Sequence, residues 1–188
     1  MHSFSATFLY LSASLLGATY ALPATPLPLT PRSCQTSYPT SMTEFTPYST
    51  SKSLSDFCIT SDTRVQYVEF GSIPSTARGA CQLEFVFPAG YSVAGPGTHK
   101  INVWKTERPV SWNDTWATAP KTITTFGTVT LNSKPTEETK LVVNSGSCES
   151  MKSFRVGLAD TRIDSSVTYT QQYPPTSVVA GMRIVHSC

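Results

Sequence analysis

The stretch CQLEFVFPAG, residues 81–90, has the clearest structural pattern in the chain. Its cysteine, its leucine and both phenylalanines fall on one face, whereas Gln82, Glu84 and Val86 fall on the other. Successive side chains of a β-strand point to opposite sides of a sheet, so this alternation is typical of a half-buried strand. The Pro-Ala-Gly that follows favours a turn and ends the strand.

Other segments with a two-residue period are spread through the rest of the chain. The clearest are 100–104 and 153–159, and the weaker ones are 64–70, 122–131, 140–144, 167–171 and 178–186. No run of about ten residues has the i, i+3, i+4, i+7 apolar spacing of an amphipathic helix. The pattern therefore predicts an all-β domain, an antiparallel β-sandwich similar to a jelly roll, preceded by an irregular N-terminal segment.

The segment 122–131 departs from strict alternation. Its apolar residues change parity between Ile123 and Phe126, ahead of Gly127. One extra residue in a strand causes such a change, so the sequence predicts a β-bulge there.

Residues 1–21 have the features of a secretory signal peptide. The apolar run Phe8–Leu16 precedes a small-residue cleavage site at Thr19-Tyr20-Ala21, so we expect the mature chain to begin at Leu22. His2 stands where Lys or Arg is usual. Because the apolar run is shorter than the roughly 20 residues that cross a bilayer, it argues against a membrane anchor.

Residues 22–55 are dominated by Pro, Ser and Thr and offer few apolar side chains to offset the entropy of ordering. We interpret them as a linker that either carries O-linked sugars or is a plain disordered tail. Met42, Phe45 and Tyr48 are the side chains available to dock its second part on the domain. The β-sandwich domain is accordingly predicted to span residues 56–188.

All five cysteines follow the predicted cleavage site, and an oxidising secretory route allows them to pair. We hypothesise a Cys81–Cys148 disulfide, since one residue opens the best strand and the other comes just before a later strand. The loop it closes is 67 residues long, which corresponds to about 4 kcal/mol in the chain-entropy model. The pairing of Cys34, Cys58 and Cys188 stays open, and the odd thiol could link two chains.

Charge indicates no nucleic-acid or membrane partner. The formal net charge is +2, from 14 basic and 12 acidic residues scattered along the chain. A protein that binds nucleic acid or an anionic membrane gathers its basic residues in a patch, and none is evident. Asn113-Asp114-Thr115 is an acceptor sequence for N-glycosylation, which would place Asn113 on the surface.

The sequence contains no recognisable catalytic constellation. No serine lies in a GxSxG elbow, and His99 and His186 are interpreted as exposed residues at strand ends. We expect Glu84 and the neighbours Glu137 and Glu138 to be solvated rather than to form a glycosidase pair. Since no Cys or His spacing fits a metal site, we predict no catalytic residue, no metal and no cofactor.

The most suggestive group of residues is aromatic. Trp104, Trp112, Trp116 and Tyr91 lie around one pair of connections, and Asp114 lies among the tryptophans. Flat aromatic faces beside polar groups stack on sugar rings and orient their hydroxyls, so these five residues are our candidates for a glycan-binding site. The alternative is that the rings close the open end of the sandwich as packing residues.

Three stretches carry a family resemblance: CQLEFVFPAGY from residue 81, INVWKTERPVSWNDTWATAPKTITTFGTVTL from 101, and NSGSCESMKSFRVGLADT from 144. Over residues 64–188 the chain resembles the fungal ubiquitin-three-binding protein C-terminal domain family, or But-two domain. The resemblance implies a small exported protein with a β-sandwich, and most members have no assigned biochemical activity. The family name derives from an intracellular interaction with the ubiquitin-like conjugation system, so only the fold and the cell-surface setting are carried over.

Composition, motifs and resemblance lead to one expectation about function. We expect a secreted, non-enzymatic fungal protein of the cell wall or extracellular space that binds cell-wall glycan. A secreted polysaccharide-active enzyme and a secreted effector-type interaction module are the alternatives.

Overall fold

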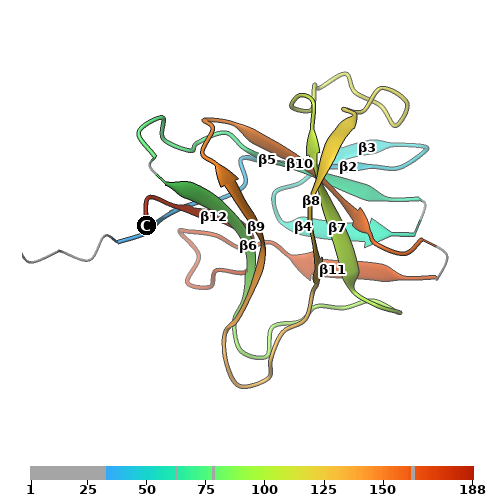
Figure 1. Cartoon of the computed structure of the whole chain (residues 1–188). Coiled ribbons are helices and arrows are strands. Elements are labelled where there is room, and N and C mark those ends of the chain that lie inside the picture. The colour runs from blue at the N-terminus through green and yellow to red at the C-terminus, as the bar shows by residue number, and fades with distance from the viewer. Residues whose placement is uncertain (1–32, 62, 78, 162–163) are drawn as a thin grey trace, which may run out of the picture. The chain divides into compact units, whose positions relative to one another are not determined.

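The computed structural model describes residues 33–61, 63–77, 79–161 and 164–188 as an all-β, sandwich-like arrangement of antiparallel sheets (Figure 1). The predicted signal peptide, its cleavage site and the first part of the predicted linker lie outside the described residues. Within the described ranges, no apolar helix has the length needed to traverse a bilayer. The predicted fold class is confirmed.

Two large sheets and one small sheet make up the domain. In spatial order, the four-stranded sheet consists of β1 (Gln35–Ser37), β12 (Gly181–His186), β6 (Ala80–Phe87) and β9 (Thr139–Ser147). The six-stranded sheet consists of β3 (Thr50–Lys52), β2 (Ser41–Phe45), β5 (Val65–Phe70), β10 (Lys152–Leu158), β7 (Lys100–Thr106) and β8 (Thr122–Thr130). The two-stranded sheet consists of β11 (Ser166–Thr170) and β4 (Asp56–Thr60).

The core follows the alternation read from the sequence. Leu83, Phe85 and Phe87 of β6 are buried, as are Phe154 and Val156 of β10. The small sheet adds aromatic rings to this core. One of them is a phenylalanine of β4 whose ring stacks on a tyrosine of β11 at 4.4 Å between centroids. Burying such side chains removes about 25 cal/mol of unfavourable hydration per Å² of apolar surface, which is the main stabilisation of the fold.

Glu84 is not solvated, and that prediction is wrong. Its residue is 4% exposed, although it points to the face of β6 opposite the core phenylalanines. The next strand, β12, places Arg183 directly opposite, and Arg183 Nε donates to Glu84 Oε1 at 2.7 Å. Gln82 Nε2 donates to the other carboxylate oxygen at 3.0 Å. A carboxylate can be buried when it is paired and hydrogen-bonded in this way.

The boundary between linker and domain also needs correction. The predicted linker extends to Ser55, but β1, β2 and β3 lie within it and are hydrogen-bonded into both large sheets. Met42 and Phe45 are buried, as docking residues should be, whereas Tyr48 is 97% exposed at the tip of the β2–β3 hairpin. Among the described residues, the first strand of the domain therefore begins at Gln35. These strands are held by the partner strands beside them rather than by a long apolar pattern of their own.

Two disulfides join distant parts of the domain. The predicted Cys81–Cys148 bridge is confirmed. The second bridge links Cys34 to Cys188 and so ties the first described strand to the end of the chain. Cys58 is left as the free thiol, partly buried on β4.

The predicted bulge in β8 is present. Val103 of β7 faces Gly127, but its neighbour Trp104 faces Thr125, so Phe126 is the extra residue on β8. Phe126 turns into the core, where it is 7% exposed. At the same place a side chain on Gly127 would meet the main-chain oxygen of Val143 at 2.6 Å, which shows how closely β8 and β9 approach.

His186 is buried, which corrects the prediction of an exposed strand-end histidine. Its Nε2 lies 3.1 Å from Ser37 Oγ on the neighbouring strand β1. His99 is partly exposed, and its Nε2 lies 2.9 Å from the main-chain oxygen of Gly95. Each ring therefore has a local structural partner.

Candidate functional site

The candidate site lies on the outer face of the six-stranded sheet, meaning the face turned away from the core. Strand alternation selects the residues that reach it. On β7 Ile101 and Val103 are buried in the core, so Asn102 and Trp104 project outward. On β10, between its buried residues, Arg155 and Gly157 project to the same outer face.

The connection between β7 and β8, residues 107–121, folds onto this outer face. It runs at the top of the view in Figure 1, above β7 and β8. Val110 and Ala119 pack against a small cluster of Phe45, Val65 and Tyr67, which is separate from the main core. These two side chains anchor the connection over β2 and β5 on the outer face of the sheet.

Asp114 organises this connection through hydrogen bonds to its neighbours. Its carboxylate accepts two hydrogen bonds from Arg108, at 2.7 and 2.8 Å, and one from the main-chain nitrogen of Ser111 at 2.6 Å. These donors hold the pKa of Asp114 below its ordinary value. Asp114 is 7% exposed. Its carboxylate is thus bonded within the connection, and its predicted contact with glycan stays a prediction that this geometry does not favour.

A cleft of about 360 Å³ lies between the sheet and the connection. Trp104 and Trp116 both line it, together with Asn102, Arg155 and Gly157. Gly157 leaves space for the indole of Trp104, since a Cβ at this position would lie 3.3 Å from Cζ3 of that ring. The ring of Trp104 therefore lies across the backbone of β10, and the space beside it stays open.

The guanidinium of Arg155 lies over the ring of Trp104. The two residues are directly opposite each other on β10 and β7, and the guanidinium carbon lies 4.9 Å from the ring centroid. This is a cation–π contact of ordinary geometry. In the same cleft Asn102 accepts a hydrogen bond from Thr128 Oγ1 at 2.5 Å, so its amide nitrogen remains free to donate.

The other two tryptophans differ in their position relative to the cleft. Trp112 is 83% exposed on the connection and does not line the cleft, whereas Trp116 is 38% exposed and does. Asn113 is exposed, as an acceptor for N-linked sugar has to be.

Tyr91 belongs to a different part of the domain, so grouping it with the tryptophans is wrong. Its ring stacks on Phe87 at 5.8 Å, and its hydroxyl donates to the main-chain oxygen of Thr170 on β11. It lines a separate hollow beside Cys58 and Tyr169. Tyr91 was grouped with the tryptophans because their loops are near one another in sequence. The residues after β6 instead turn toward the small sheet, which separates Tyr91 from the cleft.

Sequence reasoning missed Arg155, Gly157 and Asn102 as site residues. The alternation of side chains along each strand places these residues on the outer face, so their orientation could have been predicted from the sequence. What the sequence lacks is the pairing of β10 with β7, which brings Arg155 opposite Trp104.

The family comparison covers the site. A family model described as ubiquitin 3 binding protein But2 C-terminal domain matches residues 37–175. The chain belongs to this family. The matched range contains every strand of the six-stranded sheet and every cleft residue named above. No curated protein matches the chain.

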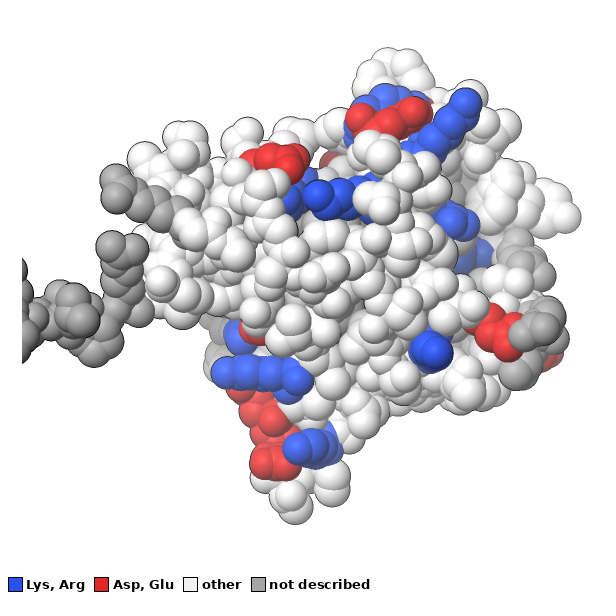
Figure 2. All heavy atoms as spheres, viewed as in Figure 1, with Lys and Arg blue, Asp and Glu red and all other residues white. Residues whose placement is uncertain are grey.

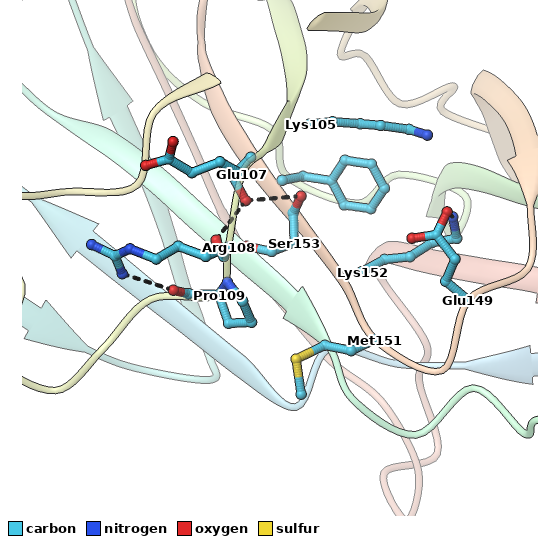
Figure 3. Close-up of a pocket in the computed structure, with 10 residues that line it drawn as sticks. Lys105, Glu107, Arg108, Pro109, Glu149, Met151, Lys152 and Ser153 are labelled. Carbon is cyan, nitrogen blue, oxygen red and sulfur yellow. Dashed lines mark hydrogen bonds and ion pairs between the residues drawn. The ribbon is translucent and has the colours of Figure 1, made fainter. Parts of the chain in front are cut away.

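The But2 domain has a further cavity, of about 200 Å³, where β7 ends and β10 begins (Figure 3). Lys152 is buried there, and burial lowers the pKa of its amine. Glu149 partly offsets this effect, since its carboxylate lies 3.6 Å from the amine. In Figure 3 the side chain of Arg108 extends away from the cavity. Lys152, Glu149 and Arg108 thus already have charged partners within the domain.

The But2 domain shows no cluster of metal ligands in its described ranges, where no three His, Cys, Asp or Glu residues lie close enough to hold an ion. Glu137 and Glu138 are exposed, and each pairs with a lysine, Lys134 at 2.6 Å and Lys140 at 3.2 Å. Most of the face drawn in Figure 2 is uncharged, with acidic and basic side chains intermixed where they occur.

Proposed function

We propose that this But2 domain is a secreted, non-enzymatic protein of the cell wall or extracellular space that binds glycan in the cleft between Trp104 and Trp116. The single observation that carries the proposal is that both indoles line one open cleft beside polar side chains. Sugar rings have apolar faces and polar rims, and a protein recognises them with aromatic faces and hydrogen-bonding groups together.

The polar groups of the cleft suit a sugar. The amide nitrogen of Asn102 can donate to a sugar hydroxyl. The hydroxyl of Thr60 lies 2.7 Å from Thr63 Oγ1 and keeps capacity for one further hydrogen bond to a ligand. Because the cleft is open to solvent, a sugar chain longer than one ring can extend out of it. A volume of about 360 Å³ is at the lower end of small-ligand sites, which fits one or two sugar units better than a long buried chain.

The secreted setting is supported by cysteine chemistry and by the N-terminal sequence. Two disulfides persist in oxidising compartments and are uncommon in the cytosol. Residues 1–21 have the composition of a signal peptide. The family name refers to binding of ubiquitin 3, but an exported chain would not meet an intracellular partner of that kind, so the proposal does not include it.

An enzyme acting on polysaccharide is the competing function. Glycosidases need two carboxylates flanking the scissile bond. Among the described residues that line the cleft there is no carboxylate, imidazole or thiol. This composition favours binding without bond cleavage.

The proposal is tested by pull-down on insoluble glucan and chitin, combined with a reducing-sugar assay on the same samples. The native protein should be enriched on at least one polysaccharide and release no sugar. Trp116→Ala should weaken retention about tenfold or more, since burying an aromatic anchor contributes upwards of 1–2 kcal/mol to binding. Trp112→Ala is the matched control, because the side chain lies outside the cleft, and it should bind like the native protein. Sugar release, or equal loss in both variants, would contradict the proposal.

A further inference from the structure

We infer that the cleft is selective for a sugar that carries a carboxylate, and that Arg155 is the residue that determines this selectivity. The inference rests on the proposed function and names the class of ligand. It concerns one side chain, so an experiment can reject it while glycan binding itself stands.

Arg155 differs from the other described arginines in having no acidic partner. Arg64 pairs with Glu44, Arg108 with Asp114 and Arg183 with Glu84. Within the described part of the chain, Arg155 makes neither an ion pair nor a hydrogen bond, and its contact is the face of Trp104. It is also half-buried in the cleft wall. A partly buried guanidinium without an anion is the group whose charge a ligand can satisfy.

The contact with the face of Trp104 leaves the N–H groups of Arg155 available to a carboxylate. An arginine that lies on an aromatic face keeps its N–H groups at the edge of the guanidinium plane, where they form a planar fork. This fork matches the two oxygens of a carboxylate, and charge-assisted bonds of this kind are shorter and stronger than neutral ones. Trp104 thus fixes the orientation of Arg155, and less side-chain entropy is lost on binding.

The rest of the cleft supplies no competing anion. Its described lining residues include one charged side chain, that of Arg155, and the neighbouring polar groups are the amide of Asn102 and hydroxyls of threonines. A hexuronate unit would place its carboxylate on the guanidinium and its hydroxyls near Asn102. A neutral sugar of the same size would gain the hydroxyl contacts alone.

The experiment uses calorimetric titration of the full mature protein with three probes. These are an oligogalacturonate, the same oligomer fully methyl-esterified, and a neutral cello-oligosaccharide of equal length. The esterified probe differs from the first in charge at the carboxyl group and little else. Arg155→Gln removes the guanidinium, and Lys100→Gln is the control, because Lys100 is an exposed cation of the neighbouring strand β7 and lies outside the cleft.

We expect the acid oligomer to bind the native protein at least about tenfold more tightly than either neutral probe, which is the effect of one hydrogen-bonded charge pair. Arg155→Gln should abolish this preference and keep weak binding of all three probes, and Lys100→Gln should retain it. Equal affinity for acid and ester in the native protein, or a preference that survives in Arg155→Gln, overturns the inference but not glycan binding. Absence of binding by all three, together with failure of the polysaccharide pull-down, overturns both.

Discussion

Removing the Cys34–Cys188 bridge should destabilise the domain without affecting the cleft. The bridge closes a loop of 154 residues, for which the chain-entropy model gives about 5 kcal/mol. The other bridge already constrains 67 residues inside that loop, so the true contribution is smaller. We therefore expect the double variant Cys34→Ser, Cys188→Ser to lose about 2–4 kcal/mol, which is the usual range for a native disulfide.

The local effect of this change is also defined by the structure. Strand β1 has only three residues, and among the described residues its one partner strand is β12. Without the bridge, β1 is held by this short ladder and by the contact between Ser37 and His186. Its main-chain amides should exchange with solvent faster than those of β6, since edge elements open before the core does.

Scanning calorimetry and hydrogen exchange of the double variant test this reasoning. At about 2–4 °C per kcal/mol for a domain of this size, the Tm should fall by about 5–15 °C. Cys58→Ser is the control for a cysteine that forms no bridge, and it should leave the Tm within about 2 °C of the native value. A Tm drop in the double variant no larger than that of Cys58→Ser would refute the argument from loop closure. Ligand affinity should be unchanged, because the cleft belongs to the other large sheet.

Three further predictions concern the cleft, the β7–β8 connection and the free thiol. Gly157→Leu should abolish ligand binding, because a side chain there meets the ring of Trp104, and it should lower the Tm by a few degrees, since such overpacking costs about 1–3 kcal/mol; titration with the glycan retained in the pull-down checks this, and undiminished affinity would place the ligand elsewhere. Because its partners hold the pKa of Asp114 below the ordinary value, the stabilisation is present above about pH 4 and is lost as the pH falls through the lowered pKa. Amide exchange in residues 107–121 should accordingly rise on acidification, and Asp114→Asn should already exchange fast at neutral pH; a native-like rate in that variant would count against the role of Arg108. Oxidation should produce a dimer through Cys58, the free and partly exposed thiol, which gel filtration with and without reductant detects; a dimer that persists in Cys58→Ser would exclude this link.

Alternation of apolar side chains predicted most of the larger strands. The patterns at 81–87, 100–104 and 153–159 correspond to β6, β7 and β10, and the parity change predicted the bulge in β8. These elements could be found locally, because each buries several apolar side chains along one face.

The strands before Asp56 could not be found in this way. β1, β2 and β3 have three to five residues each, and β3 is fully exposed. Their hydrogen bonds go to strands that are distant in sequence, such as β1 to β12. Such pairing is a property of the tertiary structure, and a Ser-, Thr- and Pro-rich composition gives it no local signal.

The candidate site was predicted in part. Two of the three tryptophans line the cleft, but Tyr91 turns toward β11 and Asp114 is held by Arg108. Whether a loop carboxylate is free depends on its partners in space, which no spacing reveals. Arg155 can be identified as a site residue only from the pairing of β10 with β7, which places it opposite Trp104.

The most direct test of the central claim uses the indole N–H signals of the three tryptophans in a ¹H–¹⁵N spectrum. Single Trp→Phe variants assign the three signals, and the protein is then titrated with the glycan that it retains in the pull-down. If the ligand occupies the cleft, the signals of Trp104 and Trp116 shift in a saturable way, while that of Trp112, which lies outside, stays in place. Movement of Trp112 alone, or of none of the three at saturating ligand, would contradict the account.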